Sequence, residues 1–527
     1  MDVLWGLGGM AALLVIAFAL STDRRAIRPR TVFGALGIQL GMGVLVLYWE
    51  QGERLLKLAS DGVAAVIESS EDGTNFLFGR LLEGEGTIFA FQVLPVVIFV
   101  ASLAAVLFHL GIMQRVVHGI GGALRIVLGT SHAESMNAAA NMFVGQTEAP
   151  LFIRPYLARL TRSELFAVMV GGLATVAGTV LVGYSLLGAP LEYLIAASFM
   201  AAPGGLLMAK IIMPETGRPE LIGPGHDTGA RPPAAAGRTG FAAALARLTP
   251  GRSGTRTPGG PQEGAGPGEG AGRGGARDAD RWSAGRWSED APGTDRQSGD
   301  DDGGDARRDA AEGDDDRRDD GRPADAGTEE GARAAGGPPG GGGRAASAMA
   351  AADEDRPLNV IDAAARGASD GLRLALNIGA MLLAFISLIA LLNLLLGTVG
   401  GWFGEDDLSF QQLIGYVFAP VMALIGVPWE EAVESGAFVG QKLVLNEFVA
   451  FAEFGPQIDQ FSEKTATITT FALTGFANFS SLAILLGGLG SLIPHRRGEI
   501  AQLGIRAIFA GTLANLMSAA IAGMLVG

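Results

Sequence analysis

The chain has 527 residues, of which 49% are hydrophobic, and its mean hydropathy is +0.33. Its formal net charge of −15 belongs largely to one glycine-rich block and to hydrophilic loops, so it does not define a binding surface. Because the chain has no cysteine, a disulfide framework, a thiolate metal site and a cysteine nucleophile are excluded.

Eight segments are long and apolar enough to cross a membrane, since a spanning helix needs about 20 mostly apolar residues. The first lacks a basic n-region and a clear cleavage site, which favours a retained helix over a signal peptide. The eight expected spans are residues 2–20, 31–49, 86–113, 164–186, 190–213, 372–396, 465–489 and 498–526.

Two further stretches, residues 134–158 and 410–452, are apolar but interrupted by Gly, Pro and acidic residues. Broken segments at corresponding positions of two halves are typical of a transporter's binding site, and they predict two re-entrant hairpins. The tetrapeptide Phe-Val-Gly-Gln occurs at 143–146 and again at 438–441, each time with a glutamate a few positions further on. We therefore interpret the chain as two related halves built around these segments.

Basic residues in the short connections predict the orientation. Arginines cluster after the first span, around the first hairpin and between the last two spans, whereas the alternate connections are acid-rich. One topology satisfies every loop: both termini lie outside, and the hairpins enter from opposite sides, as an inverted repeat requires. We expect an all-α polytopic protein of the plasma (inner) membrane, with eight transmembrane helices and two oppositely oriented re-entrant hairpins.

Residues 214–358 are rich in Gly, Pro, Ala, Asp and Arg and contain no lysine. This composition cannot offset the entropy cost of folding, so it predicts a disordered cytoplasmic insertion. Because acids outnumber the arginines, a solvated linker is favoured over a nucleic-acid patch, and no nucleic-acid partner is expected. Residues 359–374 form either an interfacial amphipathic segment or the first turns of the sixth span.

Each hairpin carries polar residues that cannot face lipid, because an unpaired polar group in hydrocarbon costs several kcal/mol. An ionisable residue within the membrane is by default a functional-site hypothesis. We interpret the one lysine among them as the partner of a nearby buried carboxylate. These residues are Gln146, Thr147 and Glu148 in the first hairpin and Lys442, Asn446 and Glu447 in the second.

Small and polar residues also occupy the centres of two spans, at 174–180 and 475–481. Isolated Gly, Ser and Thr residues there favour close helix packing, but Asn478 is not explained by packing. Amides, hydroxyls and carboxylates suit a neutral ligand with many hydrogen-bonding groups. A phosphorylated ligand would need an arginine cluster or a glycine-rich phosphate cradle, and the hairpin tips contain neither.

A cation site is one of two readings of Asn141 and Thr175, since amide, hydroxyl and free carbonyl oxygens at a broken helix can coordinate Na⁺. The other reading makes Asn141 a helix cap. An enzyme is disfavoured, because the five histidines lack metal-ligand spacing and the two glutamates lack an accompanying nucleophile or metal motif.

Three motifs resemble those of the concentrative nucleoside transporters. Residues 440–450 fit the signature G-x-K-x-x-x-N-E-F-V-A of that family, Gly145 to Pro150 resemble its first-hairpin motif, and Gly475 to Ser481 with residues 487–490 resemble its helix-7 motif. The similarity covers nearly the whole chain outside the charged block. The long acidic insertion departs from the family's common core.

The resemblance implies a symporter that imports nucleosides with a Na⁺ or H⁺ gradient as a homotrimer, by elevator-like movement of a transport domain against a scaffold. It implies no organic cofactor, and the hydroxyl of Thr175 favours Na⁺. It places the nucleobase against Gln146, Thr147 and Glu148, and the ribose against Glu447, Asn478 and Ser481. It places the apolar walls of the site at Val180 and Phe476. It implies that Na⁺ binds at Asn141 and Thr175 with the carbonyls of Val144 and Val176.

The same resemblance divides the chain into five parts. Residues 1–115 would be scaffold helices 1–3, 116–213 the first transport half, 214–358 the insertion, 359–409 the interfacial segment with scaffold helix 6, and 410–527 the second transport half. Two alternatives to a symporter remain: a passive nucleoside facilitator or channel, and a membrane scaffold or sensor that acts through the charged block.

Overall fold

The computed structural model describes residues 2–79, 89–217, 357–402, 404 and 408–526, and every regular element in them is a helix. The predicted disordered insertion lies almost entirely outside the described residues. The helices before it are α1 (Asp2–Ala19), α2 (Pro29–Leu47), α3 (Glu50–Ser69), α4 (Glu71–Phe78), α5 (Phe89–His109), α6 (Ile112–Leu128), α7 (His132–Ala140), η2 (Ala149–Ile153), α8 (Arg154–Leu157), α9 (Arg162–Ala174), α10 (Gly178–Leu186) and α11 (Leu191–Ile212).

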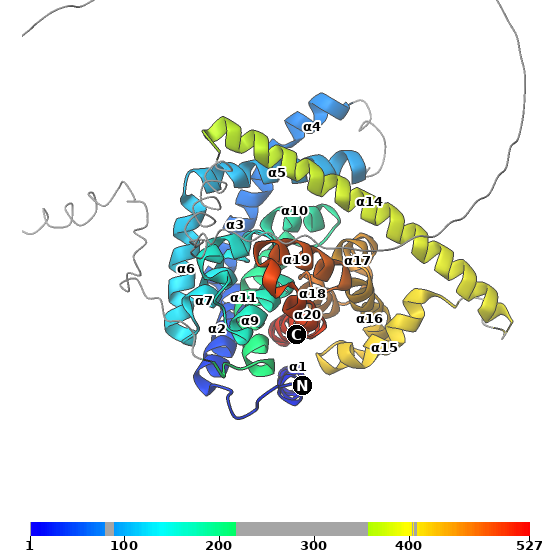
Figure 1. The fold of residues 1–527 in the computed structure, drawn as a ribbon. Coiled ribbons are helices and arrows are strands. Elements are labelled where there is room, and N and C mark those ends of the chain that lie inside the picture. Colours follow the sequence, from blue (N-terminus) through cyan, green and yellow to red (C-terminus); the bar gives the residue numbers. More distant parts are fainter. Residues whose placement is uncertain (1, 80–88, 218–356, 403, 405–407, 527) are drawn as a thin grey trace, which may run out of the picture. The chain divides into compact units, whose positions relative to one another are not determined.

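The helices after the insertion repeat the order of those from α5 to α11. In each half a long helix and a shorter helix precede two broken helices and a final long helix, and the second set begins with α14 (Figure 1). These helices are α14 (Val360–Gly401), α15 (Phe410–Leu424), α16 (Trp429–Val444), α17 (Glu447–Phe454), η3 (Gly455–Gln460), α18 (Glu463–Leu473), α19 (Phe479–Leu492), η4 (Pro494–Arg496) and α20 (Arg497–Val526).

The repeated tetrapeptide does not mark equivalent positions in the two halves. Residues 143–146 lie in the non-helical break after α7, whereas residues 438–441 lie inside α16. The corresponding break of the second half is at Leu445 and Asn446. Our alignment of the halves on this tetrapeptide is therefore wrong, although the order of elements supports two related halves.

Six spans among the described residues are long and apolar enough to cross a membrane, one of them formed by α9 and α10 together. The helices α15 and α16 pass the same test as a pair but are bent by 117°. Two of the expected spans differ from the prediction: α1 is a shorter apolar helix, and residues 465–489 divide into α18 and α19. The structure is thus that of a helical membrane protein, and the number eight stays a prediction.

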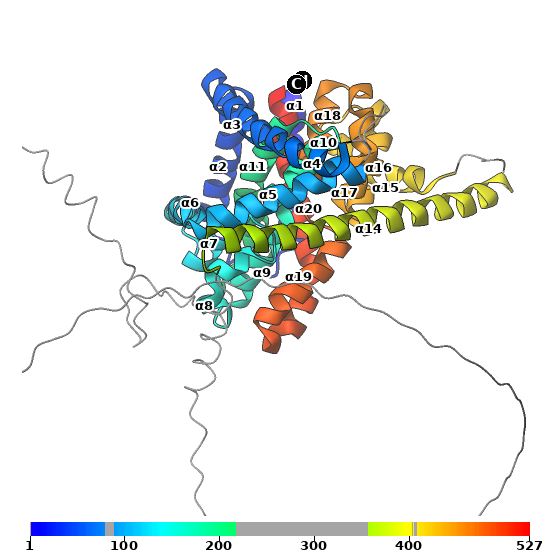
Figure 2. The same ribbon diagram turned by 90° about the horizontal axis from the view of Figure 1, so that it is seen from above.

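The helices α5 and α14 pack along each other, and Figures 1 and 2 show α14 running beside α5. Glycine makes this close approach possible, because a Cβ atom at Gly371 would lie 2.8 Å from the Cα atom of Ile98. The Ser102 hydroxyl donates to the Ala364 carbonyl at 2.9 Å. Since α14 is continuous from Val360, the segment 359–374 consists mostly of the first turns of this helix.

The first and last helices pack side by side, so the two ends of the described chain lie together (Figure 2). A Cβ atom at Gly6 would lie 2.8 Å from the Cβ atom of Met524. The Trp5 indole also donates to the Ala423 carbonyl at 2.6 Å, at the end of α15. This face therefore carries both termini and the connection between α15 and α16.

The connections with clustered basic residues meet at the other end of the helices. The Arg496 guanidinium donates to the Leu160 carbonyl at 2.6 Å, which joins the connection after α19 to the one before α9. The Lys210 ammonium donates to the Ser163 hydroxyl at 2.8 Å and pairs with Glu134. Further links at this end are Thr22 N to Ile212 O and Arg30 Nη2 to Ile126 O.

Candidate functional site

The first broken segment forms a non-helical tip between α7 and η2. A capping box of Ser131 and Glu134 begins α7, and Pro150 lies at the start of η2, where its missing N–H leaves no donor unpaired. The tip packs on α9 because glycine leaves room for it: a Cβ atom at Gly172 would lie 2.8 Å from the Cβ atom of Gln146. The Gly178 N–H donates to the Phe143 carbonyl at 3.0 Å, so the tip is also tied to α10.

The second broken segment ends where Asn446 caps α17. The Asn446 Oδ1 atom accepts the Val449 N–H at 3.0 Å, and Glu447 is the first residue of the helix. A carboxylate at this position is favoured by the partial positive charge of a helix N-terminus. The Glu447 side chain is therefore held by local sequence at a buried position, with 4% of its surface exposed.

A chain of hydrogen bonds connects this carboxylate to the first half. The Asn478 Nδ2 atom donates to Glu447 Oε2 at 2.7 Å, and Asn478 Oδ1 accepts the Ser481 N–H at 2.6 Å as the N-cap of α19. The Gln146 Nε2 atom donates to the Ser481 carbonyl at 3.2 Å. Four predicted substrate residues, far apart in sequence, therefore form one buried polar array.

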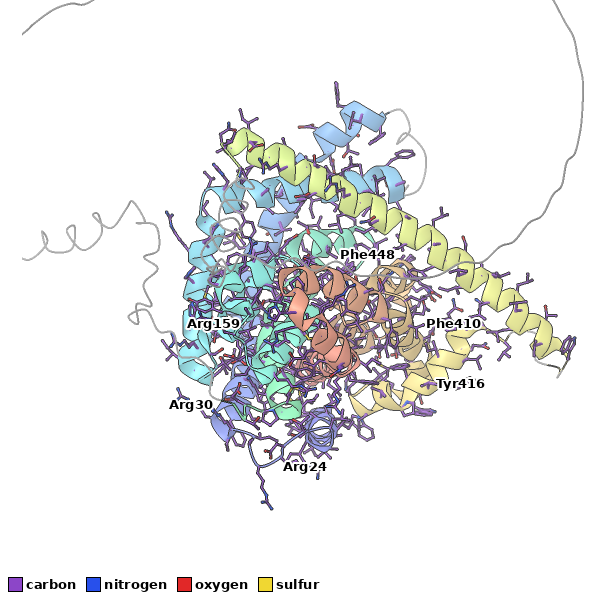
Figure 3. The ribbon with its side chains drawn as sticks, in the orientation of Figure 1. Arg24, Arg30, Arg159, Phe410, Tyr416 and Phe448 are labelled. Atoms are coloured by element: carbon purple, nitrogen blue, oxygen red, sulfur yellow. The ribbon has the colours of Figure 1, made fainter. Side chains whose placement is uncertain are left out.

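An aromatic cluster closes one side of this array. The Tyr184 ring stacks on Phe451 at a centroid distance of 4.5 Å and meets Phe448 edge-on at 4.8 Å. Figure 3 shows Phe448 among the helices, whereas Tyr416 on α15 lies at their edge. Tyr184 is fully buried, and its hydroxyl interacts electrostatically with Glu447. The cluster keeps the carboxylate in a surrounding of low polarity.

The two broken helices cross at their breaks. The Phe476 N–H donates to the Thr175 carbonyl at 3.2 Å. The Asn515 Nδ2 atom, from α20, donates to the Ala174 carbonyl at 2.7 Å and to the Thr474 carbonyl at 2.9 Å. One amide thus satisfies the last carbonyls of α9 and of α18 together, which buried backbone groups require.

Lys442 lies in the same crossing, and its partner differs from the expected one. Its Nζ atom donates to the Ala472 carbonyl at 2.8 Å and to Asn515 Oδ1 at 2.9 Å, and no carboxylate lies within ion-pair distance among the described residues. The interpretation of Lys442 as the partner of a carboxylate is therefore wrong. Glu447 attracts it only at longer range. Lys442 is also buried, with 2% of its surface exposed.

The residues expected to hold Na⁺ fit that ion. Asn141 is fully buried, and neither of its amide atoms has a hydrogen-bond partner among the described residues, so its side chain caps no helix there. The Thr175 hydroxyl donates to the Gly171 carbonyl at 2.8 Å, which leaves its oxygen free to accept or coordinate. No described hydrogen bond uses the carbonyls of Val144 or Val176. The C-terminal ends of α7 and α9, with their partial negative charge, border this place.

Three predicted substrate residues stay apart from the hydrogen-bonded array. The Glu148 side chain is exposed, and its hydrogen bond among the described residues is the one it accepts from the Gly145 N–H of its own tip, at 3.4 Å. Thr147 faces α19, where Gly488 leaves room for it. Val180 is buried in α10 without a polar role. Sequence analysis missed Asn515 and Tyr184, although an amide in the apolar second half of α20 is a signal that could have identified Asn515.

Comparisons with known proteins identify a family of related transporters. Residues 8–81, 90–191 and 338–523 match the family models described as Na⁺ dependent nucleoside transporter N-terminus, nucleoside recognition and Na⁺ dependent nucleoside transporter C-terminus. The uncharacterized transporter YutK of Bacillus subtilis is 42% identical, with 100% of each chain covered. Nucleoside permease NupC of Helicobacter pylori is 37% identical, with 99% of this chain and 98% of that protein covered.

A solved structure, CNTnw in an inward-facing substrate-bound state, is 41% identical with a TM-score of 0.73, and the match covers 100% of this chain and 98% of that one. The fold and these relatives define a multi-pass helical membrane transporter, and the matching family and structural neighbours are transporters, not enzymes. The chain belongs to the concentrative nucleoside transporter family, which confirms the resemblance inferred from its motifs.

Proposed function

We propose that this protein is a symporter that imports nucleosides with an inward Na⁺ gradient. The observation that carries the proposal is the hydrogen bond from Asn478 to the buried Glu447. A buried carboxylate with one amide partner retains free lone pairs, and these can accept the two neighbouring hydroxyls of a ribose. The match to the nucleoside transporter family models and the related nucleoside permease support nucleosides as the ligand.

In this proposal the two halves divide the ligand between them. Glu447, Asn478 and Ser481 bind the ribose hydroxyls, while Gln146, Thr147 and Glu148 face the nucleobase. In the part of the chain that the structure describes, the Gln146 Oε1 atom is buried without a hydrogen-bond partner. This supports a ligand donor for it, because such an atom costs about 1–3 kcal/mol when left unpaired. Phe476 and Val180 supply the apolar walls.

The coupling ion in this proposal binds at Asn141 and Thr175 with the carbonyls of Val144 and Val176. Na⁺ would supply the positive charge that these oxygens and the two helix C-termini favour. The same segment carries Gln146, so ordering the tip for the ion also positions a base-binding side chain. This shared segment is the physical reason to couple the two ligands.

Orientation and assembly complete the proposal. The basic connections share one face of the helices, and the termini share another, which supports a cytoplasmic basic face and outward termini in the inner membrane. The α14 helix exposes many leucines, including Leu383 and Leu394, to lipid or to neighbouring copies in a homotrimer. Elevator-like movement of the broken helices of both halves against α5 and α14 would carry the binding site from one side of the membrane to the other.

The experiment is uptake of radiolabelled uridine and adenosine into proteoliposomes with a Na⁺ gradient, a proton gradient or none. A Na⁺-driven symporter accumulates nucleoside only with the Na⁺ gradient. A passive facilitator equilibrates nucleoside and ignores both gradients. Deletion of residues 220–350 tests the third reading, because transport that survives the deletion makes the charged block an accessory.

A further inference from the structure

We propose that the Lys442 ammonium occupies, in the second half of the chain, the place that the coupling cation occupies in the first, so that the two halves together bind one exchangeable cation. The inference rests on the proposed function, because it takes the Na⁺ site at Asn141 as the reference. It assigns Lys442 a role as a built-in cation rather than as a ligand of the nucleoside.

The two halves bring the same elements to the two places. In the first half, the end of α7 meets the break after α9, and Asn141 and Thr175 directly follow those helices. In the second half, the end of α16 meets the break after α18. Lys442 belongs to the last turn of α16, and its Nζ atom reaches the Ala472 carbonyl in the last turn of α18 at 2.8 Å.

The surroundings of Lys442 are those that a cation requires. Its two hydrogen-bond acceptors, the Ala472 carbonyl and Asn515 Oδ1, are hard oxygen atoms of the kind that coordinate Na⁺. The C-terminal ends of α16 and α18 add partial negative charge. Glu447 supplies a full negative charge at longer range.

The place in the first half differs from the one in the second half in whether its side-chain oxygen already has a partner. There, both amide atoms of Asn141 are buried and lack partners within the described ranges, whereas the Asn515 side-chain oxygen in the second half is already paired with Lys442. Unpaired oxygen atoms can bind an ion that exchanges with solvent. Oxygen atoms that already accept hydrogen bonds from a lysine ammonium cannot. The Lys442 nitrogen is covalently attached to the chain and so cannot exchange, whereas a cation bound at the first place can.

The test measures Na⁺-dependent thermal unfolding of the purified full chain, with choline chloride replacing NaCl at constant ionic strength. A ligand that binds only the folded state stabilises it in proportion to the logarithm of its concentration, and two bound ions double the slope of one. Lys442→Ser vacates the ammonium and adds an oxygen, whereas Lys442→Met removes the charge but fills the space. Asn141→Ala removes the first-half site.

We expect the Lys442→Ser slope to be about twice the wild-type slope, and the Lys442→Met slope to equal the wild-type slope. Equal slopes in the wild type, Lys442→Ser and Lys442→Met would overturn the inference and leave the proposed function intact. A flat wild-type response with a rising Lys442→Ser response would reject Na⁺ binding at Asn141, and with it the comparison between the halves, but would show that the place of the Lys442 ammonium can bind Na⁺. A Lys442→Ser protein that is unfolded in choline must regain its fold in saturating NaCl, and failure to do so counts against the inference.

Discussion

The Asn478 amide nitrogen donates a 2.7 Å hydrogen bond to the Glu447 carboxylate, which joins the cap of α19 to the first residue of α17. Both residues are buried, and each lies at a helix N-terminus. The position of Glu447 therefore depends on two local structures, and each contribution can be removed separately.

Glu447→Gln abolishes concentrative uridine uptake while the protein still inserts. Gln has one acceptor oxygen with two lone pairs, so once Asn478 donates to it a single lone pair remains for the two ribose hydroxyls, and its NH2 group cannot accept. Hydrogen bonds to charged groups contribute about 1.5–3 kcal/mol, so nucleoside affinity should fall about 10- to 100-fold. Glu430→Gln, at an exposed glutamate of α16, is the matched control. Undiminished uptake by Glu447→Gln would remove Glu447 from the ribose site.

Asn478→Ser separates the cap of α19 from the bond to Glu447. Serine is also a good N-cap, so thermal stability should be close to that of the wild type, while nucleoside affinity falls with the lost amide donor. Asn478→Ala loses both functions and should unfold with about 1 kcal/mol less free energy. Denaturation and binding isotherms measured on the same preparations check both. Wild-type affinity in Asn478→Ser would show that the amide does not position Glu447.

The sequence predicts those residues of the site that belong to local patterns, and it does not predict those whose contacts join distant segments. The motif residues Gln146, Glu447 and Asn478 are identified from sequence because each lies where a local pattern is interrupted. The role of Asn515 needs three segments brought together, and no local pattern contains that information. The wrong prediction of a carboxylate partner for Lys442 has the same origin. Its ammonium donates to a backbone carbonyl, and because any residue type can supply a carbonyl, the sequence does not reveal this acceptor.

The helix order was predictable for a similar reason. Apolar length identifies most of the long helices, and the broken first segment carries the glycine and proline that interrupt it. The breaks after α9 and α18 were harder to predict, because residues 164–186 and 465–489 are apolar enough to read as continuous spans. The tetrapeptide repeat led to the wrong alignment of the halves, because a short identity does not imply the same backbone conformation.

Asn141→Ala removes the dependence of uptake on Na⁺. The variant deletes both unpaired amide atoms at the proposed ion site but leaves the hydroxyl of Thr175 and the contacts of α9 in place. We expect slow uptake that is equal in NaCl and choline chloride. Thr179→Val, which deletes a half-buried hydroxyl just beyond the break, is the control and should retain Na⁺ dependence. Full Na⁺ stimulation of Asn141→Ala would place the ion elsewhere.

Two adjacent glycines of α19 test the contact between the halves. A Cβ atom at Gly488 would lie 3.1 Å from the Cβ atom of Thr147, whereas none at Gly487 would meet an atom within 4 Å. Gly488→Ala should therefore displace the first tip and raise the KM for nucleoside severalfold. Gly487→Ala should leave KM unchanged. Initial uptake rates across substrate concentrations decide between them, and equal KM values would show that the tip does not pack on α19 during binding.

The central claim is that this chain couples nucleoside to Na⁺. The most direct test is the steady-state ratio of internal to external uridine in proteoliposomes with an imposed Na⁺ gradient and no membrane potential. For one ion per nucleoside, a tenfold Na⁺ gradient carries about 1.4 kcal/mol and raises the ratio toward about ten. A ratio that stays at one, whatever the Na⁺ gradient, would contradict the account.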